Sequence, residues 1–241
     1  MTTHLSATSS AALLAVAAIA LATGLGATPP AQAPNTLTAD ERAAGWRLLF
    51  DGATIDQWRG FREPAVPAGW QVVDGAITRA GRGGDLISRE EFGDFEFAFD
   101  WRLAAAGGNS GVMFRVVLGL EQTYHSGPEL QLLDDEGHRD GRVPETSCGA
   151  NYALHASSKP MCGPIGEWNQ TRLVVRGPHV EHWMNGEKVV EYELWSPDWK
   201  ARVAASKFKA WPEYGMAKSG HLALQDHGNP VSFRNLKILT R

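Results

Sequence analysis

The sequence has few cysteines, no excess of positive charge and few long apolar runs, and each of these shortages excludes a class of protein. The 241 residues include 2 cysteines and carry a formal net charge of −4 at pH 7. With this balance and no basic stripe, we do not expect a nucleic-acid partner. The spacing of Cys148 and Cys162 does not fit a zinc site. In an oxidising compartment the two could close a loop disulfide, or they could be independent small residues.

The only extended apolar run, at residues 13–21, is too short to span a bilayer comfortably. Its small flanking residues are typical of a secretory hydrophobic region, so we predict that residues 1–33 are a signal peptide and linker. The protein is then periplasmic or extracellular, with no stable membrane span after cleavage. An uncleaved anchor is the alternative, because no Lys or Arg precedes the run.

From residue 45 onward the hydrophobic pattern has the two-residue period of β-strands, most clearly at 95–103. Asp74-Gly75 and Asn185-Gly186 each separate two such segments, and both dipeptides favour the positive φ angles of two-residue hairpin turns. Residues 45–241 are therefore predicted to form one all-β sandwich domain of jelly-roll type. Further strands are expected at 111–117, 128–133, 171–176, 221–226 and 231–239, a short helical turn at 38–41, and long irregular stretches at 135–150 and 195–219.

Polar side chains interrupt several of these strands and are candidates for a site. Arg115 follows the polar turn Asn109-Ser110-Gly111 inside an apolar strand, where a buried guanidinium needs an acidic partner. Glu129 supplies one, and alternation places it on the same face as Gln131. A carboxylate and a carboxamide on one face suit the hydroxyl groups of a sugar, although a solvated outer face would show the same pattern.

A second polar group lies near the end of the chain. Gln225 and His227 share one face at the end of a strand, and Asp226 lies on the other. Because an unperturbed imidazole titrates near neutral pH, His227 could be an acid, a base or a metal ligand, or simply a hydrogen-bonded residue. Asp134, Asp135 and Asp226 could bind a divalent cation, but no spacing specifies one, and no other cofactor is predicted.

Short motifs follow one another along the whole domain: Gly45-Trp46, Leu49-Phe50-Asp51-Gly52, Trp58, Trp70, Asp74-Gly75, Asp94-Phe95, Asn109-Ser110-Gly111, Phe114-Arg115, Glu129-Leu130-Gln131, Asp134, Gly149-Ala150, Tyr152, Gly166-Glu167-Trp168-Asn169, His182-Trp183, Asn185-Gly186, Leu224-Gln225-Asp226-His227-Gly228 and Phe233-Arg234-Asn235. In this order they resemble the 3-keto-disaccharide hydrolase family, formerly domain of unknown function 1080. The resemblance implies a concanavalin A-like, glucanase-like jelly roll, export, and cleavage of glycosides already oxidised at carbon 3 of the sugar. The stretch at 135–147 and the two cysteines are not part of the family pattern, so the exact substrate stays open.

A ketone at carbon 3 acidifies the proton at carbon 2. A base can remove that proton, the enolate can expel the glycosidic oxygen from carbon 1, and water can then add back. This chemistry needs a base, a cation or donor beside the enolate oxygen, and an acid for the leaving group. We predict Glu129 or His227 as the base and Arg115 as the oxyanion partner. Further substrate contacts or supporting roles are assigned to Asn109, Gln131, Gln225, Asp134, Asp226 and Trp168, with His125 and Tyr124 as candidate leaving-group acids.

Two other functions fit parts of the pattern. A conventional glycosidase needs two carboxylates at a defined separation, and the strand of Glu129 lacks a second acid because Gln131 and Leu133 follow it. A non-catalytic carbohydrate-binding module would need only aromatic platforms such as Trp168, Trp183 and Trp211. We therefore predict an exported hydrolase, or lyase and hydratase, whose small-molecule partner is a 3-keto-oligosaccharide or glycoside.

Overall fold

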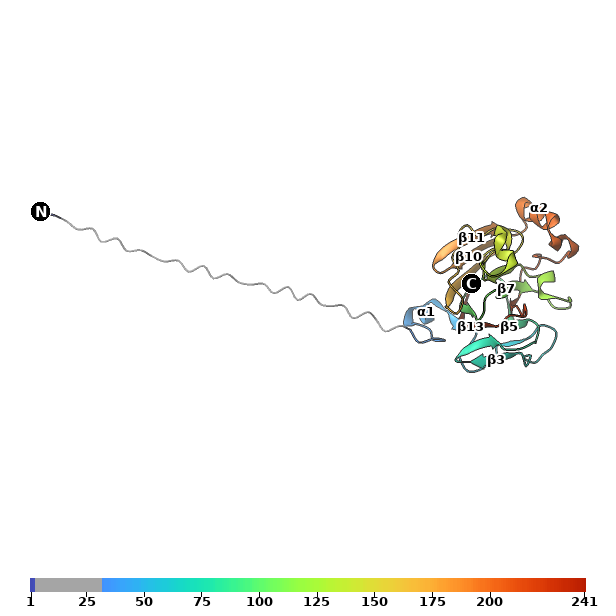
Figure 1. Cartoon of the computed structure of the whole chain (residues 1–241), viewed down its shortest axis with the longest axis horizontal. Coiled ribbons are helices and arrows are strands. Elements are labelled where there is room, and N and C mark those ends of the chain that lie inside the picture. Colours follow the sequence, from blue (N-terminus) through green and yellow to red (C-terminus); the bar gives the residue numbers. More distant parts are fainter. Residues whose placement is uncertain (3–31) are drawn as a thin grey trace. The chain divides into compact units, whose positions relative to one another are not determined.

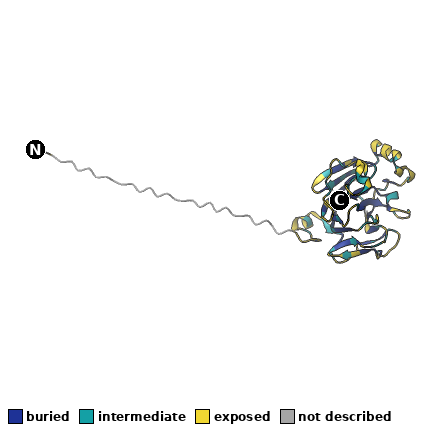
Figure 2. Ribbon diagram, in the orientation of Figure 1, coloured by how far each residue is buried: buried dark blue, intermediate teal, exposed yellow. Residues whose placement is uncertain are grey.

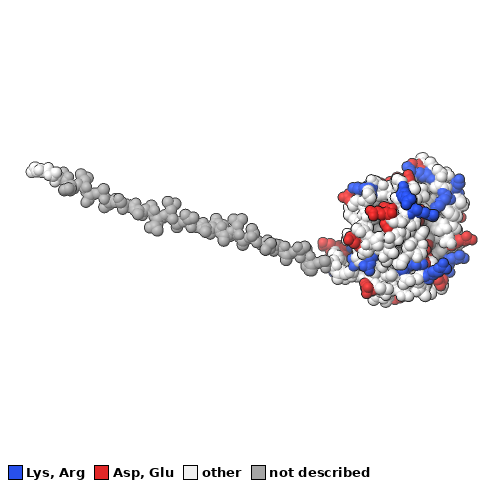
Figure 3. Space-filling model, viewed as in Figure 1, with Lys and Arg blue, Asp and Glu red and all other residues white. Residues whose placement is uncertain are grey.

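The computed structural model describes residues 1–2 and 32–241, so the predicted signal peptide lies outside the described residues apart from its ends. Residues 32–241 form one compact unit (Figure 1). No helix in the described part of the chain combines the length and the hydropathy needed to cross a membrane. Acidic and basic side chains are interspersed over the face of this unit shown in Figure 3.

The described residues form two antiparallel β-sheets. The first contains β1 (Arg47–Leu48), β3 (Trp70–Val73), β4 (Ala76–Arg79), β6 (Phe95–Leu103), β9 (Asn169–Arg176), β10 (His179–Met184), β11 (Glu187–Glu193) and β13 (Val231–Thr240), and the second contains β2 (Trp58–Gly60), β5 (Leu86–Phe92), β7 (Asn109–Val116), β8 (Glu129–Leu133) and β12 (Gly220–Leu224). The eight-stranded sheet has the order β11-β10-β9-β6-β13-β4-β3, with β1 paired to β13, and the five-stranded sheet has the order β2-β5-β12-β7-β8. The predicted all-β sandwich of concanavalin A-like, jelly-roll class is confirmed.

Alternate apolar side chains from both sheets fill the space between them. Phe95 and Phe97 on β6 are fully buried, as are Val112 on β7 and Leu130 on β8, and all belong to one core cluster. Burying each such side chain stabilises the fold by roughly 1.5–3 kcal/mol. Figure 2 shows the buried colour mainly on the strands and the exposed colour on loops and on the helical segment near α2. The side chains at the alternate positions of each strand therefore point outward, where they can form a site.

The two predicted hairpins are confirmed. Asp74 and Gly75 connect β3 to β4 with φ angles of 50° and 70°, and Asn185 and Gly186 connect β10 to β11 with φ angles of 49° and 87°. Positive φ at both central residues matches the right-handed twist of the flanking strands. The helical turn expected at 38–41 is also present, as α1 (Ala39–Ala44) with a capping box from Thr38.

The prediction of a wholly irregular stretch at 195–219 was wrong. Residues Pro197–Ala205 form helix α2, and Lys207–Ala210 form the 3-10 helix η4. The Ser196 hydroxyl accepts a hydrogen bond from the Trp199 N–H at 3.1 Å, and Pro197 occupies the first turn, so both start signals are local. Shorter 3-10 helices are η1 (Thr123–His125), η2 (Arg139–Arg142) and η3 (Pro144–Thr146).

Candidate active site

Glu129 lies in a row of side chains on the outer face of the five-stranded sheet. Strand register places it opposite Met113 on β7, which in turn lies opposite Ala223 on β12. On the other side, the Tyr152 N–H donates to the Glu129 carbonyl at 3.0 Å, so a short segment extends the sheet beyond β8. Directly opposed residues in antiparallel strands share a face. Glu129 thus lies between Met113 and Tyr152 across the strands, and it is buried.

A second row runs beside the first and carries carboxamides. Gln131 on β8 lies opposite Gly111 on β7, and the Gln225 N–H donates to the Gly111 carbonyl at 2.9 Å. A Cβ at position 111 would collide with the Glu129 carboxyl group. The missing side chain of Gly111 therefore leaves room for the carboxyl group to lie across β7.

Three carboxamide oxygens on this face have no hydrogen-bond partner among the described residues. They are Asn109 Oδ1, Gln131 Oε1 and Gln225 Oε1, each buried from solvent. Asn109 and Gln131 are themselves 2 % and 1 % exposed. Buried polar atoms in native proteins are nearly always paired, so unpaired acceptors that project from one sheet face indicate a ligand that donates hydrogen bonds.

Burial dominates the acidity of Glu129. It raises the pKa of the Glu129 carboxyl group to about 8, because the charged form loses its hydration. The positive charge of Lys207 and a side-chain hydrogen bond from Gln225 oppose this shift, whereas the negative charges of Asp85 and Asp140 reinforce it. A carboxyl group with this pKa can change its protonation state near neutral pH, which is what proton transfer requires.

Aromatic side chains surround the Glu129 end of the face. Tyr124 packs on the apolar patch that includes Met113 and Ala223, and the Lys207 ammonium lies 5.8 Å from the centre of the Tyr124 ring and 4.4 Å from that of Tyr152. His125 stacks on Trp211 with ring centres 4.5 Å apart. Of the two residues predicted as leaving-group acids, Tyr124 therefore packs on the apolar side chains next to Glu129, and His125 stacks on Trp211.

His227 lies at the opposite end. Asn109 Nδ2 lies 3.4 Å from His227 Nε2, and the rings of His138 and His227 meet edge-on with centres 6.1 Å apart. His227 is exposed, unlike Glu129. Asp85 bridges the two ends: it accepts hydrogen bonds from the Thr123 hydroxyl and the backbone N–H of Asp226, and burial raises its pKa.

The structure does not bring Arg115 to this site, and the expected pairing with Glu129 was wrong. Arg115 has a φ of 52°, and the register between β7 and β12 shifts at this point, so the strict alternation assumed from the sequence fails there. Its guanidinium donates to the Gly93 carbonyl and to Asp94 at 3.1 and 3.2 Å, and it lies 5.6 Å from the Trp195 ring. Arg115 is buried and ties the β5–β6 turn to β7.

Asp226 and Asp134 are held by hydrogen bonds within the fold and are not arranged for a ligand. Asp226 accepts from Arg79 Nε at 2.6 Å and from two consecutive N–H groups at residues 83–84. Asp134 accepts from the N–H groups of Gly107 and Glu136. The predictions that these carboxylates bind substrate, orient His227 or hold a metal ion with Asp135 are not supported, because their oxygens already stabilise loops.

Trp168 lies on the other side of the sandwich. Its ring contacts the guanidinium groups of Arg102 and Arg234 at 4.7 and 4.0 Å, on the outer face of the eight-stranded sheet. The predicted substrate contact by Trp168 is therefore wrong for the site around Glu129.

Among the described residues, the side chains close enough together to hold a metal ion also lie on this other sheet. They are His179, Glu181 and Glu191. The Lys188 ammonium binds both carboxylates, at 3.3 and 2.7 Å, and already neutralises them.

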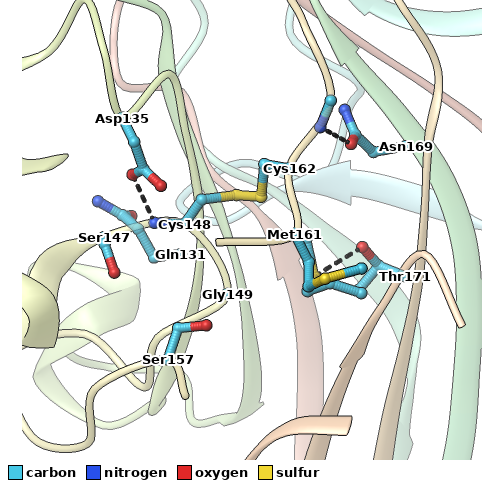
Figure 4. Close-up of a disulfide and its surroundings, with 12 residues drawn as sticks. Gln131, Asp135, Ser147, Cys148, Gly149, Ser157, Met161, Cys162, Asn169 and Thr171 are labelled. Carbon is cyan, nitrogen blue, oxygen red and sulfur yellow. Dashed lines mark hydrogen bonds between the residues drawn. A yellow bond between two sulfur atoms is a disulfide. The ribbon is translucent and has the colours of Figure 1, made fainter. Parts of the chain in front are cut away.

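A disulfide between Cys148 and Cys162 stabilises the loop beside the carboxamide row (Figure 4). The Cys148 N–H donates to Asp135 Oδ1 at 2.8 Å, and the next N–H, from Gly149, donates to the Gln131 carbonyl at the same distance. Gln131 Nε2 reaches the Thr146 carbonyl at 3.3 Å. The loop disulfide considered from the sequence thus forms, and it lies within one residue of the backbone that positions Gln131.

Sequence reasoning missed Asp85, Asp140, Tyr152 and Lys207 as neighbours of Glu129. Asp85 follows a glycine-rich turn and directly precedes an apolar strand, a position that signals a strand-end side chain. Lys207 carries no such signal, because its position depends on the fold of the segment after β11.

Together, the fold and this face define the class of the protein: a β-sandwich in which the outer face of the five-stranded sheet holds a buried acid beside unpaired hydrogen-bond acceptors. The chain belongs to the family of 3-keto-alpha-glucoside-1,2-lyase-like domains, whose model matches residues 45–239.

Individual relatives agree with this family. The chain is 33 % identical over 228 residues to the 3-keto-disaccharide hydrolase of Bacteroides thetaiotaomicron, covering 81 % of this chain and 78 % of the relative. A crystal structure of a candidate glycosyl hydrolase from Parabacteroides distasonis is 34 % identical, with a TM-score of 0.80 over 87 % of this chain and 100 % of that one. A second Parabacteroides structure, 24 % identical with a TM-score of 0.64 over 81 % and 99 % of the two chains, shares the fold.

Proposed function

We propose that this protein cleaves the glycosidic bond of a sugar oxidised to a ketone at carbon 3, by removal of the carbon 2 proton, elimination and hydration. The coarser assignment, a hydrolase acting on sugars, rests on the family and on the named activity of the Bacteroides relative. Export to the periplasm or the exterior is part of the same proposal and depends on the signal peptide predicted from the sequence.

The observation that carries the proposal is the position of a buried carboxyl group, with its pKa raised to about 8, on a face with three unpaired carboxamide oxygens. Sugar hydroxyl groups donate hydrogen bonds, so acceptors at Asn109, Gln131 and Gln225 fit a pyranose ring. A carboxylate with a raised pKa is a stronger base than an exposed one, which favours removal of a weakly acidic C–H proton.

In the proposed reaction, Glu129 takes the carbon 2 proton and the electron pair moves onto the ketone oxygen as an enolate. The enolate re-forms its carbonyl group as the carbon 1–oxygen bond breaks, and the leaving oxygen takes a proton from an acid at the site. Water then adds across the double bond, with hydroxide to carbon 1 and a proton returned to carbon 2. Tyr124, on the apolar patch that includes the Glu129 neighbour Met113, and His227, beside Asn109, are the candidates for the acid.

The base assignment predicts a pH dependence of defined sign. At pH 7 only about one tenth of a group with a pKa near 8 is ionised, so kcat/KM should rise as the pH increases through 8. If Glu129 were instead the leaving-group acid, kcat/KM would fall over the same range.

The test measures turnover of a 3-keto-glucoside by the wild type and by Glu129→Gln, with Glu191→Gln on the other sheet as the matched control. We expect Glu129→Gln to lose at least about 100-fold in kcat, as is typical for a general base, and Glu191→Gln to lose none. His227→Ala and Tyr124→Phe identify the acid by the same measurement. An active Glu129→Gln enzyme would contradict the assignment.

Two further measurements separate this reaction from its rivals. In D₂O the product should carry deuterium at carbon 2, whereas direct displacement at carbon 1 leaves that position unlabelled. A conventional glycosidase would hydrolyse an unoxidised nitrophenyl glucoside, and a binding module would retain 3-keto-glucoside without forming product.

A further inference from the structure

The positive charge of Lys207 acts on the Glu129 carboxyl group and lowers its pKa. Lys207 has no carboxylate partner within ion-pair distance among residues 32–241. Its ammonium lies 4.4, 5.2 and 5.8 Å from the ring centres of Tyr152, Phe208 and Tyr124. Tyr152 lies opposite Glu129 at the edge of the sheet, and Tyr124 packs on the apolar patch that includes Met113, the strand neighbour of Glu129. The ammonium and the carboxyl group therefore both lie beside Tyr152.

Lys207 itself is exposed, and the segment that carries it is fixed by contacts on either side. The Ser206 hydroxyl caps η4 by accepting from the Phe208 N–H at 3.1 Å, and Phe208 is buried against Tyr214 with ring centres 3.8 Å apart. The neighbouring Gly215 N–H donates to the Ser126 carbonyl at 2.7 Å, which ties this segment to the turn before β8. The segment that carries Lys207 is thus anchored to the turn that leads into the strand of Glu129.

We infer that Lys207 is a catalytic residue whose ammonium stabilises the enolate oxygen formed when Glu129 removes the carbon 2 proton. This inference rests on the function proposed above and assigns to Lys207 the role that sequence reasoning gave to Arg115. The chemistry supports Lys207 in this role. An ammonium group over aromatic rings keeps its positive charge and has no anionic partner, and the enolate oxygen becomes that partner during the reaction. Proton transfer from carbon to Glu129 moves negative charge to the ketone oxygen, so the cation gains most in the transition state.

The experiment compares Lys207→Met and Lys207→Arg with Lys209→Met, a matched exposed lysine on the same 3-10 helix. With a 3-keto-glucoside, we expect Lys207→Met to lower kcat about 100-fold while KM changes less than threefold, because the lost interaction belongs to the transition state. Lys207→Arg should recover at least a tenth of the activity. Lys209→Met should match the wild type.

The pH profile supplies a readout that a merely structural role would not move. Because the charge of Lys207 lowers the pKa of Glu129, its removal should shift the rising limb of kcat/KM to higher pH, and Lys207→Arg should not. If the wild type is active and Lys207→Met matches Lys209→Met in rate and pH profile, this inference alone is overturned. An inactive, folded wild type would overturn the proposed function and this inference with it.

Discussion

At the scale of single residues, the burial of the Glu129 carboxyl group lowers the stability of the fold. Glu129 has its pKa raised from 4.5 to about 8 in the folded protein. Between these pH values the folded state keeps a proton that the unfolded chain releases, so the free energy of unfolding falls as the pH rises. Below pH 4.5 both states are protonated and the penalty vanishes. Functional sites often hold a group in an environment that is unfavourable for it, and the fold loses stability as a result.

Glu129→Gln should therefore be more stable than the wild type, and increasingly so with pH. Glutamine does not titrate, so the stability gap should widen between pH 5 and pH 8 by about 3 kcal/mol. Urea unfolding of both proteins at several pH values measures it, with Glu191→Gln as the control. A gap that stays constant with pH would show that the Glu129 carboxyl group has an ordinary pKa.

Individual residues also show what alternation can and cannot predict. Glu129 and Gln131 share a face because β8 is regular, and this was readable from the sequence. Arg115 was misplaced because one residue with positive φ breaks the two-residue period, and nothing in the side-chain pattern marks that break. Asp226 was misread because its partners, Arg79 and the 83–84 backbone, are more than 140 positions distant in the chain.

At the scale of elements, the strands and hairpins could be predicted, whereas the loops that complete the site could not. Asp-Gly and Asn-Gly turns impose local geometry, so β3–β4 and β10–β11 follow from short sequence signals. The segment containing α2 and η4 has only its Ser-Pro start as a signal, and its placement over the sheet depends on contacts such as that between Gly215 and Ser126. Lys207 could be recognised only once that segment was in place.

The disulfide between Cys148 and Cys162 should stabilise both the fold and the loop beside Gln131. Replacing Cys148 and Cys162 together with serine removes a cross-link over a sequence separation of 14 residues, which should cost about 3 kcal/mol. We expect the melting temperature to fall by about 6–10 °C and KM to rise, because the loop also supplies the Thr146 carbonyl that holds Gln131. Calorimetry and steady-state kinetics measure the two effects. An unchanged KM in the folded variant would show that the loop does not position the carboxamide row.

At the scale of the whole molecule, the two outer faces of the sandwich differ in kind. The five-stranded sheet presents a buried acid and unpaired acceptors, whereas the eight-stranded sheet presents paired charges, such as Arg172 and Arg176 on Glu96, and a tryptophan covered by two arginines. Groups that are already paired within the protein have few free hydrogen bonds or charges for binding a ligand. The chemistry should accordingly be confined to one face.

Trp168→Ala tests this confinement. Since Trp168 packs against Arg102 and Arg234 on the far face, kcat/KM for a 3-keto-glucoside should stay within twofold of the wild type. Sugar affinity measured by calorimetry should also be unchanged. A marked loss of affinity would move the sugar-binding surface to the eight-stranded sheet and favour the binding-module reading.

One absent methyl group has a consequence for how such a site can be gained or lost. The carboxyl group of Glu129 rests over Gly111, where any larger residue would displace it. Pushed outward, it would regain hydration, its proton affinity would drop to that of an ordinary surface acid, and the acid would remain present yet be chemically silent. Relatives of this fold that keep the glutamate but carry a side chain at the position of Gly111 should therefore lack the proposed activity.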